Sequence, residues 1–89
     1  MNARPVTIVN KLGLHARAAT RLVNCASGYS ADVRLVRGAR SVNAKSIMGV
    51  LTLAAATGAE LVIEADGVDE DAAVEAIAAL IDDRFGEEQ

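Results

Sequence analysis

Four segments of the chain have the composition or the alternation of β-strands. Residues 6–9 form a β-branched run that starts after Pro5, at a point where a missing N–H group matters least. Residues 31–36 alternate between apolar and polar side chains, and after a turn a shorter candidate strand follows at residues 41–43. Alternation returns at residues 61–65. The pattern predicts four short strands, of which the middle two form a hairpin.

Apolar residues recur at helical spacing in two segments of the first half of the chain. The first predicted helix follows Gly13, runs to about Ser27 and ends at Gly28, so His15 lies at or just before its N-terminus. A second, shorter helix is expected after Ser46, because serine is a preferred N-cap residue. Its apolar residues are Ile47, Val50 and Leu51.

The last predicted helix has the clearest pattern. Asp66 and Gly67 form a turn into Asp69, which is expected to cap a helix with two acidic residues in its first turn. The apolar stripe of this helix consists of Ala73, Ala76, Ile77, Leu80 and Ile81. Gly86 precedes a charged tail that we expect to fray.

The predicted elements follow the order βαββαβα, without a repeat or a linker. Helices interrupt the strands, so a simple meander is excluded and an antiparallel sheet with helices on one face is favoured. We therefore predict an α+β fold, an open-faced β-sandwich in which three helices pack on one face of a four-stranded antiparallel sheet. Residues 1–89 are expected to form a single domain.

Composition narrows the class of protein. The apolar residues are mostly Ala, Val and Leu, with one Tyr and one Phe, so we expect a core of small, tightly packed side chains. The single cysteine, Cys25, excludes an internal disulfide, and one His with one Cys cannot supply a transition-metal site, so neither a metal nor a cofactor is expected. With no signal peptide or long apolar run, we predict a cytoplasmic protein without membrane insertion.

The net charge of −3 hides an asymmetry between the two halves of the chain. Residues 1–45 carry one acid, Asp32, against eight basic residues: Arg4, Lys11, Arg17, Arg21, Arg34, Arg37, Arg40 and Lys45. In residues 46–89 the only base is Arg84. If the basic half gathers around His15, it favours encounter with an acidic partner, whereas the alternative is a solvated surface of mixed charge.

His15 is the only histidine, and its position has chemical consequences. A helix N-terminus has free N–H groups and partial positive charge, which favour a bound anion and disfavour imidazolium. Residues 10–31 contain no acid, so we expect a neutral, nucleophilic imidazole, flanked by the guanidinium groups of Arg17 and Arg21. The alternative is an exposed histidine without chemistry.

Three segments together resemble a known family. The segments NKLGLHARAATRLV, NAKSIMGVLTL and DGVDEDAAVEAIAALI are similar, in order and spacing, to the histidine-containing phosphocarrier protein HPr of the bacterial phosphotransferase system. The resemblance implies that His15 accepts a phosphoryl group on Nδ1 from enzyme I, which takes it from phosphoenolpyruvate, and passes it to enzyme IIA proteins, in sugar uptake and/or its regulation. Arg17 is then the residue that stabilises the transferring group.

The resemblance also implies regulation and docking. Ser46 would be a regulatory phosphorylation site for an HPr kinase/phosphorylase, although an N-cap role alone also explains a serine there. The partner-binding residues implied are Thr20, Arg21, Ile47, Met48 and Leu51. We expect Val50 and Leu53 to lie in the core and the apolar residues of the docking set to be exposed.

Several alternatives stay open at this point. Ala18 stands where many family members have proline, and the HARAA form resembles the nitrogen-branch relatives called NPr, so coupling to sugar uptake cannot be assumed. A nucleic-acid binding module would need aromatic stacking residues, which the predicted strands lack. An independent enzyme would need a pocket and a carboxylate beside His15, and neither is expected. We predict a monomeric carrier rather than an enzyme.

Overall fold

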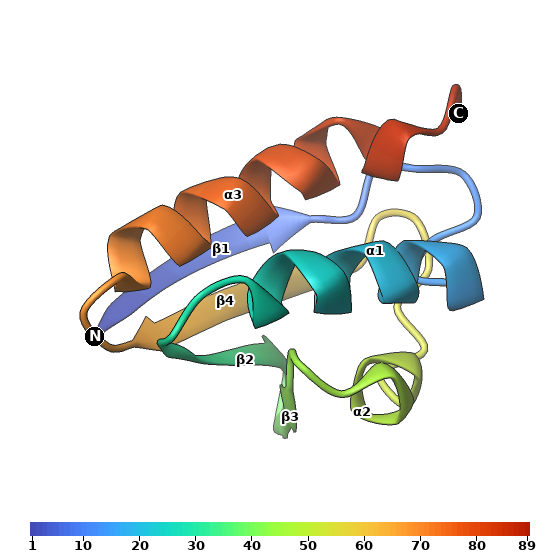
Figure 1. Ribbon diagram of the computed structural model, residues 1–89. Coiled ribbons are helices and arrows are strands. Elements are labelled where there is room, and N and C mark those ends of the chain that lie inside the picture. The colour runs from blue at the N-terminus through green and yellow to red at the C-terminus, as the bar shows by residue number, and fades with distance from the viewer.

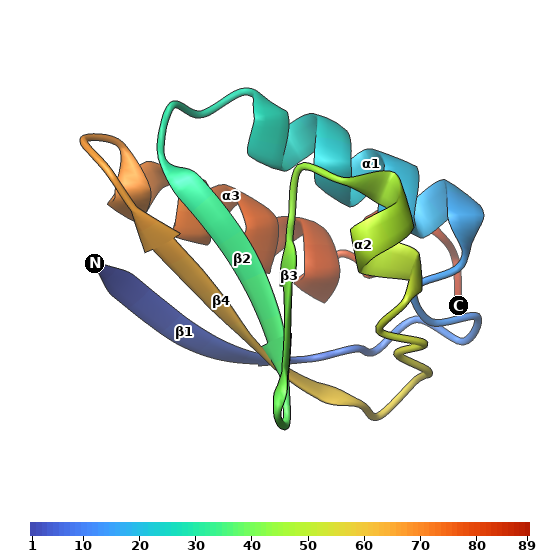
Figure 2. The ribbon, with the colours of Figure 1, turned by 90° about the horizontal axis from the view of Figure 1, so that it is seen from below.

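The structure of residues 1–89, a computed structural model, is built on one antiparallel sheet of four strands. Its strands are β1 (Asn2–Thr7), β2 (Asp32–Arg37), β3 (Arg40–Asn43) and β4 (Glu60–Asp66). Their order across the sheet is β1-β4-β2-β3, so the first and third strands form the edges (Figure 2). Every pair of neighbours is antiparallel, as predicted.

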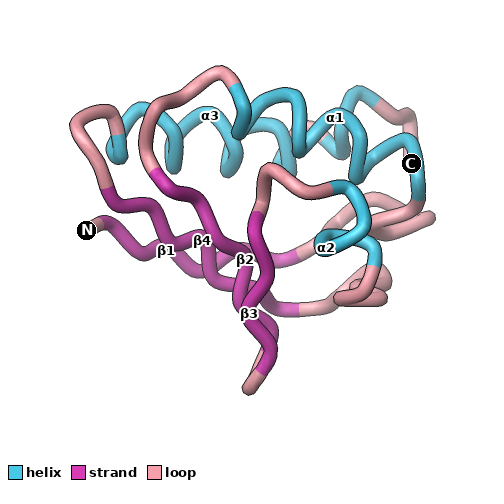
Figure 3. The backbone as a smooth tube through the Cα atoms, turned by 60° about the horizontal axis from the view of Figure 1, so that its bottom comes forward, coloured by secondary structure: helices cyan, strands magenta, loops and turns pink.

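Three α-helices and one short 3₁₀ helix complete the fold. They are α1 (Ala16–Ser27), α2 (Ile47–Leu51), α3 (Glu70–Asp82) and η1 (Arg84–Gly86). α1 and α3 lie side by side over one face of the sheet (Figure 1). α2 lies beside the first half of α1, at one end of this layer (Figure 2). The opposite face of the sheet carries no helix (Figure 3), which confirms the open-faced α+β sandwich.

The core lies between the sheet and the helices. In β4, Leu61, Ile63 and Ala65 alternate with more exposed residues and face the helical layer. Side chains of Ala, Val, Leu and Ile fill most of this space, as the composition predicts. Burial of one such larger side chain contributes about 1.5–3 kcal/mol. Phe85, in η1, is the one aromatic ring that is completely buried.

The first strand begins earlier than the sequence predicts. β1 starts at Asn2 and ends at Thr7, so Pro5 lies inside the strand, where it is paired with Val62. This position is tolerated because β1 is an edge strand, in which a proline nitrogen can face away from the neighbouring strand. Arg4 is a charged residue at a partly buried position of β1. This is tolerated because its guanidinium donates to the carboxylate of Glu75 on α3 at 2.7 Å.

Asp69 occupies the predicted N-cap position of α3, but its carboxylate does not cap the helix. It accepts hydrogen bonds from the backbone N–H groups of Ser30 and Ala31, both at 2.8 Å. The side chain therefore ties the α1–β2 loop to the start of α3. None of the helices combines the length and the apolar character that crossing a bilayer requires.

Candidate functional site

His15 is the N-cap residue of α1, as the sequence predicts. Its backbone is extended, with φ −76° and ψ 178°, and the chain reaches it through Gly13 in the left-handed region, at φ +68°. A side chain at position 13 would place its Cβ 2.5 Å from the carbonyl oxygen of Ala55. The neighbouring N–H of Leu14 donates to this same oxygen at 2.8 Å. Glycine thus lets the histidine loop lie directly against the loop before β4.

Both ring nitrogens of His15 have a partner. The backbone N–H of Arg17 donates to Nδ1 at 3.3 Å, which is the capping contact of the helix. Nε2 lies 2.5 Å from Oε2 of Glu87, a residue of the C-terminal tail. The side chains of His15 and Glu87 are 28% and 14% exposed, so the pair is largely shielded from water on one side.

These two contacts favour one tautomer of the neutral ring. The N–H of Arg17 is a donor, so Nδ1 meets it with a lone pair. An ionised carboxylate is only an acceptor, so Nε2 carries the hydrogen that faces Glu87. The Nε2–H tautomer satisfies both contacts and leaves Nδ1 as the nucleophilic nitrogen.

Glu87 is held in the ionised form by its surroundings. A hydrogen bond from Nδ2 of Asn10, at 2.9 Å, is the main cause of a lowered pKa of the Glu87 carboxyl. Burial opposes this effect by raising the pKa of Glu87, while the contact with His15 and the charge of Arg21 lower it further. Asn10 is itself completely buried, and its Nδ2 also donates to the carbonyl of Gly13 at 2.9 Å.

Two predictions about this region are wrong. No carboxylate was expected beside His15 and the C-terminal tail was expected to fray, whereas the tail places Glu87 against the ring. The N–H of Lys11 also donates to the carbonyl of Gln89 at 2.9 Å. The acidic residue comes from more than 70 positions away, so no local pattern reveals it. One signal was present: an aromatic residue followed by glycine, Phe85-Gly86, interrupts the polar tail and indicates an anchored end.

Arg17 and the start of α1 form the exposed side of the site. The N–H groups of residues 16–18 donate to no backbone carbonyl. The N–H of Arg17 donates instead to Nδ1 of His15, and the other two have no partner. The exposed side chain of Arg17 borders an open hollow beside the ring. The hollow is lined by Lys11, Leu12, His15, Ala16, Arg17 and residues 87–89. Free amides, a helix N-terminus and a guanidinium together suit an anion bonded to Nδ1.

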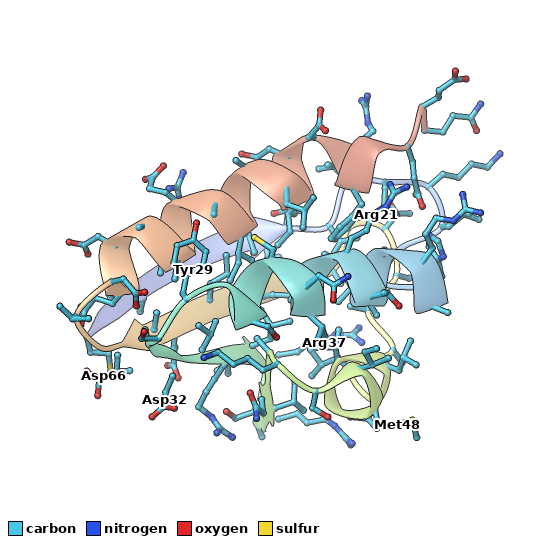
Figure 4. The ribbon with its side chains drawn as sticks, viewed as in Figure 1. Arg21, Tyr29, Asp32, Arg37, Met48 and Asp66 are labelled. Carbon is cyan, nitrogen blue, oxygen red and sulfur yellow. The ribbon has the colours of Figure 1, made fainter.

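Arg21 does not lie beside the exposed ring as predicted. Its guanidinium donates to the backbone carbonyl of Phe85, and Figure 4 shows the side chain on the side of α1 that faces the end of the chain. Thr20 is exposed, and its hydroxyl donates to the carbonyl of Ala16 at 2.8 Å within the helix. Of the two arginines, only Arg17 lines the hollow.

The structure places Ser46 and the predicted docking residues on α2 and its N-cap. The hydroxyl of Ser46 accepts from the N–H of Gly49 at 3.1 Å. Met48 is 73% exposed and points away from the molecule (Figure 4), Ile47 is 40% exposed, and Leu51 is half-buried. Val50 and Leu53 are buried, as predicted. No group of three or more His, Cys, Asp or Glu side chains is arranged to hold a metal ion.

Comparison with known proteins gives a consistent result. The family model described as "PTS HPr component phosphorylation site" matches residues 3–83. The phosphocarrier protein HPr of Cupriavidus necator is 51% identical over 87 residues, covering 98% of each chain. The phosphocarrier protein NPr of Shewanella violacea is 46% identical and covers 94% of this chain and 92% of its own. The crystal structure of HPr-C-His from Thermoanaerobacter tengcongensis superposes with a TM-score of 0.97 at 40% identity, covering both chains fully. The chain therefore belongs to the HPr family of phosphotransferase-system phosphocarriers.

Proposed function

We propose that Nδ1 of His15 accepts a phosphoryl group from enzyme I, which is charged by phosphoenolpyruvate, and passes it to an enzyme IIA protein. One observation carries this proposal: Nδ1 of His15 points its lone pair toward the backbone N–H groups at the N-terminus of α1. Membership of a phosphocarrier family supports it independently.

The surroundings of Nδ1 suit both the acceptance and the release of the group. As the Nδ1–P bond forms and the bond to the donor breaks, the N–H of Arg17 leaves Nδ1 and, with the free N–H groups of Ala16 and Ala18, meets the charge on the three phosphoryl oxygens. The guanidinium of Arg17 can move over the open hollow to pair with the same oxygens. Because the hollow is open, donor and acceptor proteins can both approach the ring.

Two branches of the phosphotransferase system are candidate pathways. Relatives named HPr and NPr align over nearly the whole chain with similar identity, 51% and 46%. Ala18, in place of the proline common in HPr, favours the nitrogen branch. In that branch the recipient would be a regulatory enzyme IIA not coupled to sugar uptake. Competition between purified enzyme IIA proteins of the two branches for phosphoryl transfer would decide between them.

α2 is proposed as the docking surface and Ser46 as the site of regulation. The exposed side chains of Ile47 and Met48, with half-buried Leu51, would pack against enzyme I or enzyme IIA. Thr20 and Arg21 would border this contact on α1. A kinase acting on Ser46 would place a dianion at the edge of the same surface.

A nucleic-acid binding role has little support from the structure. Bases stack on exposed aromatic rings, yet Phe85 is buried and Tyr29 is only partly exposed at the end of α1. The open face of the sheet, which such modules use, carries neither ring. The phosphocarrier proposal is therefore the one to test.

The test is phosphoryl transfer to variants of His15 and Arg17. Wild-type protein mixed with enzyme I and phosphoenolpyruvate should gain one acid-labile phosphoryl group, detected by intact mass. His15→Ala should gain none and stay folded, because the ring is at the surface end of α1. Arg17→Ala should transfer about 10²–10³ times more slowly, the loss typical of one removed charge-stabilising donor. Acid-labile phosphate on the His15→Ala protein would disprove the assignment.

A further inference from the structure

The backbone before Glu87 adopts an unusual conformation. Arg84, Phe85 and Gly86 all have positive φ, at 56°, 55° and 77°. Two of the three are not glycine, and such residues rarely stay in the left-handed region unless the surrounding structure holds them there. Here the holding contacts are the complete burial of the Phe85 ring and the hydrogen bond from Arg21 to the Phe85 carbonyl. The direction of the tail is thus set by the fold.

This backbone brings Glu87 to His15 with both carboxylate oxygens engaged. Oε1 accepts from Nδ2 of Asn10 at 2.9 Å, and Oε2 faces Nε2 of His15 at 2.5 Å. Two residues later, the carbonyl of Gln89 accepts from the N–H of Lys11. In Figure 1 the C-terminus lies above the loop after β1, and Figure 2 shows it at the same end of the molecule as the start of α1. The tail is therefore a fixed wall of the site on the Nε2 side of the ring.

We propose that Glu87 is a positioning residue for phosphoryl transfer, which holds the hydrogen of His15 on Nε2 and stabilises the positive ring that forms when Nδ1 is phosphorylated. The inference rests on the proposed function of His15. It concerns a residue outside the segment matched by the family model, which ends at residue 83.

The chemistry of the step explains why a carboxylate at Nε2 matters. The Nδ1 lone pair forms the new N–P bond while the bond from phosphorus to the donor breaks, and the donor keeps that electron pair. No proton leaves His15, so the ring with phosphorus on Nδ1 and hydrogen on Nε2 carries a positive charge. Glu87 opposes this charge directly at Nε2, as a buried carboxylate does for the imidazolium of a catalytic triad. The positive charge on the phosphorylated ring also makes the imidazole a good leaving group in the next transfer.

The other charged groups around the pair do not replace this carboxylate. Lys11 on the loop and Arg17 and Arg21 on α1 are all positive. The other carboxylate of the tail is the side chain of Glu88, which borders the hollow. No hydrogen bond or ion pair joins the Glu88 side chain to His15, so it provides a matched control.

The first measurement is the ¹⁵N NMR spectrum of the His15 ring in the full-length protein without phosphate, at a pH where the ring is neutral. The wild type should show a dominant Nε2–H tautomer and a slowly exchanging Nε2 proton. Glu87→Ala should increase the Nδ1–H tautomer, whereas Glu87→Gln should keep the wild-type tautomer through its amide oxygen. Glu88→Ala should match the wild type. Because the wild-type spectrum reports the contact by itself, a fast-exchanging Nε2 proton would overturn the inference even if a variant failed to fold.

The second measurement is the rate of transfer from enzyme I to the wild type, to the two Glu87 variants and to a control variant outside the site. Glu87→Ala and Glu87→Gln should both be about tenfold slower than the wild type, because each lacks the charge that opposes the cationic ring. Asp82→Ala, at an exposed carboxylate of α3 that lies outside the hollow and has no hydrogen bond or ion pair, should transfer at the wild-type rate. Equal rates for the wild type and both Glu87 variants would overturn the inference while leaving His15 as the acceptor. A wild-type protein that is never phosphorylated would instead overturn the proposed function, and the NMR spectra would still report the contact.

Discussion

At the scale of single residues, the site depends on side chains that form hydrogen bonds with the backbone as well as on those that would contact the phosphoryl group. Buried Asn10 joins the loop carbonyl of Gly13 to the tail carboxylate of Glu87. Ser46 uses its hydroxyl to accept the N–H of Gly49, as an N-cap should. For Ser46, a structural role is therefore present whether or not regulation exists.

The two roles of Ser46 separate when charge is added at this position. Ser46→Ala should lower the free energy of unfolding by ~1 kcal/mol through the lost cap, yet accept phosphoryl groups normally. Ser46→Asp should unfold at or near the wild-type temperature, because a carboxylate suits a helix N-terminus. It should also accept phosphoryl groups several-fold more slowly, because the charge lies beside the proposed docking residues. Thermal unfolding and transfer rates measure the two effects, and equal rates in all three proteins would leave Ser46 as a cap alone.

At the scale of elements, sequence patterns predicted what is local and missed what is held by distant contacts. The helix starting at His15, the cap at Ser46 and the central strands follow from spacing and capping preferences, and the structure confirms them. The bracing of the histidine loop does not follow from any such pattern. Arg37 donates to the carbonyls of Leu53 and Ala54, at 2.7 and 3.1 Å. Ala55, next along the chain, accepts from Leu14.

The same reasoning explains the early start of β1 and the docked tail. Asn2 and Arg4 have little strand preference, and they join the sheet because α3 offers them carboxylates: Nδ2 of Asn2 donates to Asp71 at 2.8 Å. Glu87 reaches His15 because burial of Phe85 fixes the chain just before it. Such contacts depend on the whole fold, so a reading of single segments does not reveal them.

The short helix α2 gives a prediction at the same scale. Met48→Glu should weaken association with enzyme I about 10- to 30-fold and leave the unfolding temperature nearly unchanged, because this side chain is 73% exposed. Val50→Glu is the matched control on the same helix: Val50 is completely buried, so the charge should unfold the protein. Calorimetry of binding and thermal unfolding measure both. Unchanged affinity in the Met48 variant would remove α2 from the docking surface.

At the scale of the whole molecule, the charge asymmetry of the sequence becomes a difference between two ends. The site end carries Lys11 and Arg17 around His15, together with the C-terminal tail. The opposite end carries the N-terminus and acidic residues such as Asp32 and Asp66 (Figure 4). The basic half does not gather at the site as a whole: Arg4 pairs with Glu75, and Arg37 braces a loop. A partner therefore meets a small area of mixed charge around the histidine, with Lys11 and Arg17 beside Glu87 and Glu88, rather than a broad basic face.

Three carboxylates tie the two ends to the fold, and all three have a lowered pKa. Hydrogen bonds from the backbone N–H groups of Ser30 and Ala31 lower the pKa of Asp69, with that of Ser30 the main cause. The N-terminal ammonium lowers the pKa of Glu70, and Asn10 is the main cause of the lowered pKa of Glu87. In return, Glu70 raises the pKa of the N-terminal ammonium. Each of these contacts contributes to stability only while its groups are charged.

The signs of these shifts predict how stability depends on pH. A carboxylate with a lowered folded pKa contributes fully above its unfolded value, about 4 for Asp and Glu, and the contribution is lost as pH falls through the folded value. An ammonium with a raised pKa contributes fully below its unfolded value, about 8, and loses its contribution as pH rises through the folded value. Urea unfolding across this range should therefore give a plateau between about pH 4.5 and 7.5, with a decline on both sides.

The variant that tests this account is Asp69→Asn, because Asp69 alone holds two backbone N–H groups of a distant loop. The asparagine side chain can accept only one of the two bonds, so the variant should be less stable than the wild type at pH 7. It should also lose less stability than the wild type as the pH falls from 5 to 3, since the ionised form no longer has to be protonated. Asp82→Asn, at an exposed carboxylate without a hydrogen bond or ion pair, should follow the wild-type curve. If the Asp69 variant declined in acid as steeply as the wild type, the acid sensitivity would have to come from Glu70 or Glu87, and the Glu70→Gln or the Glu87→Gln curve would then have to be the flatter one.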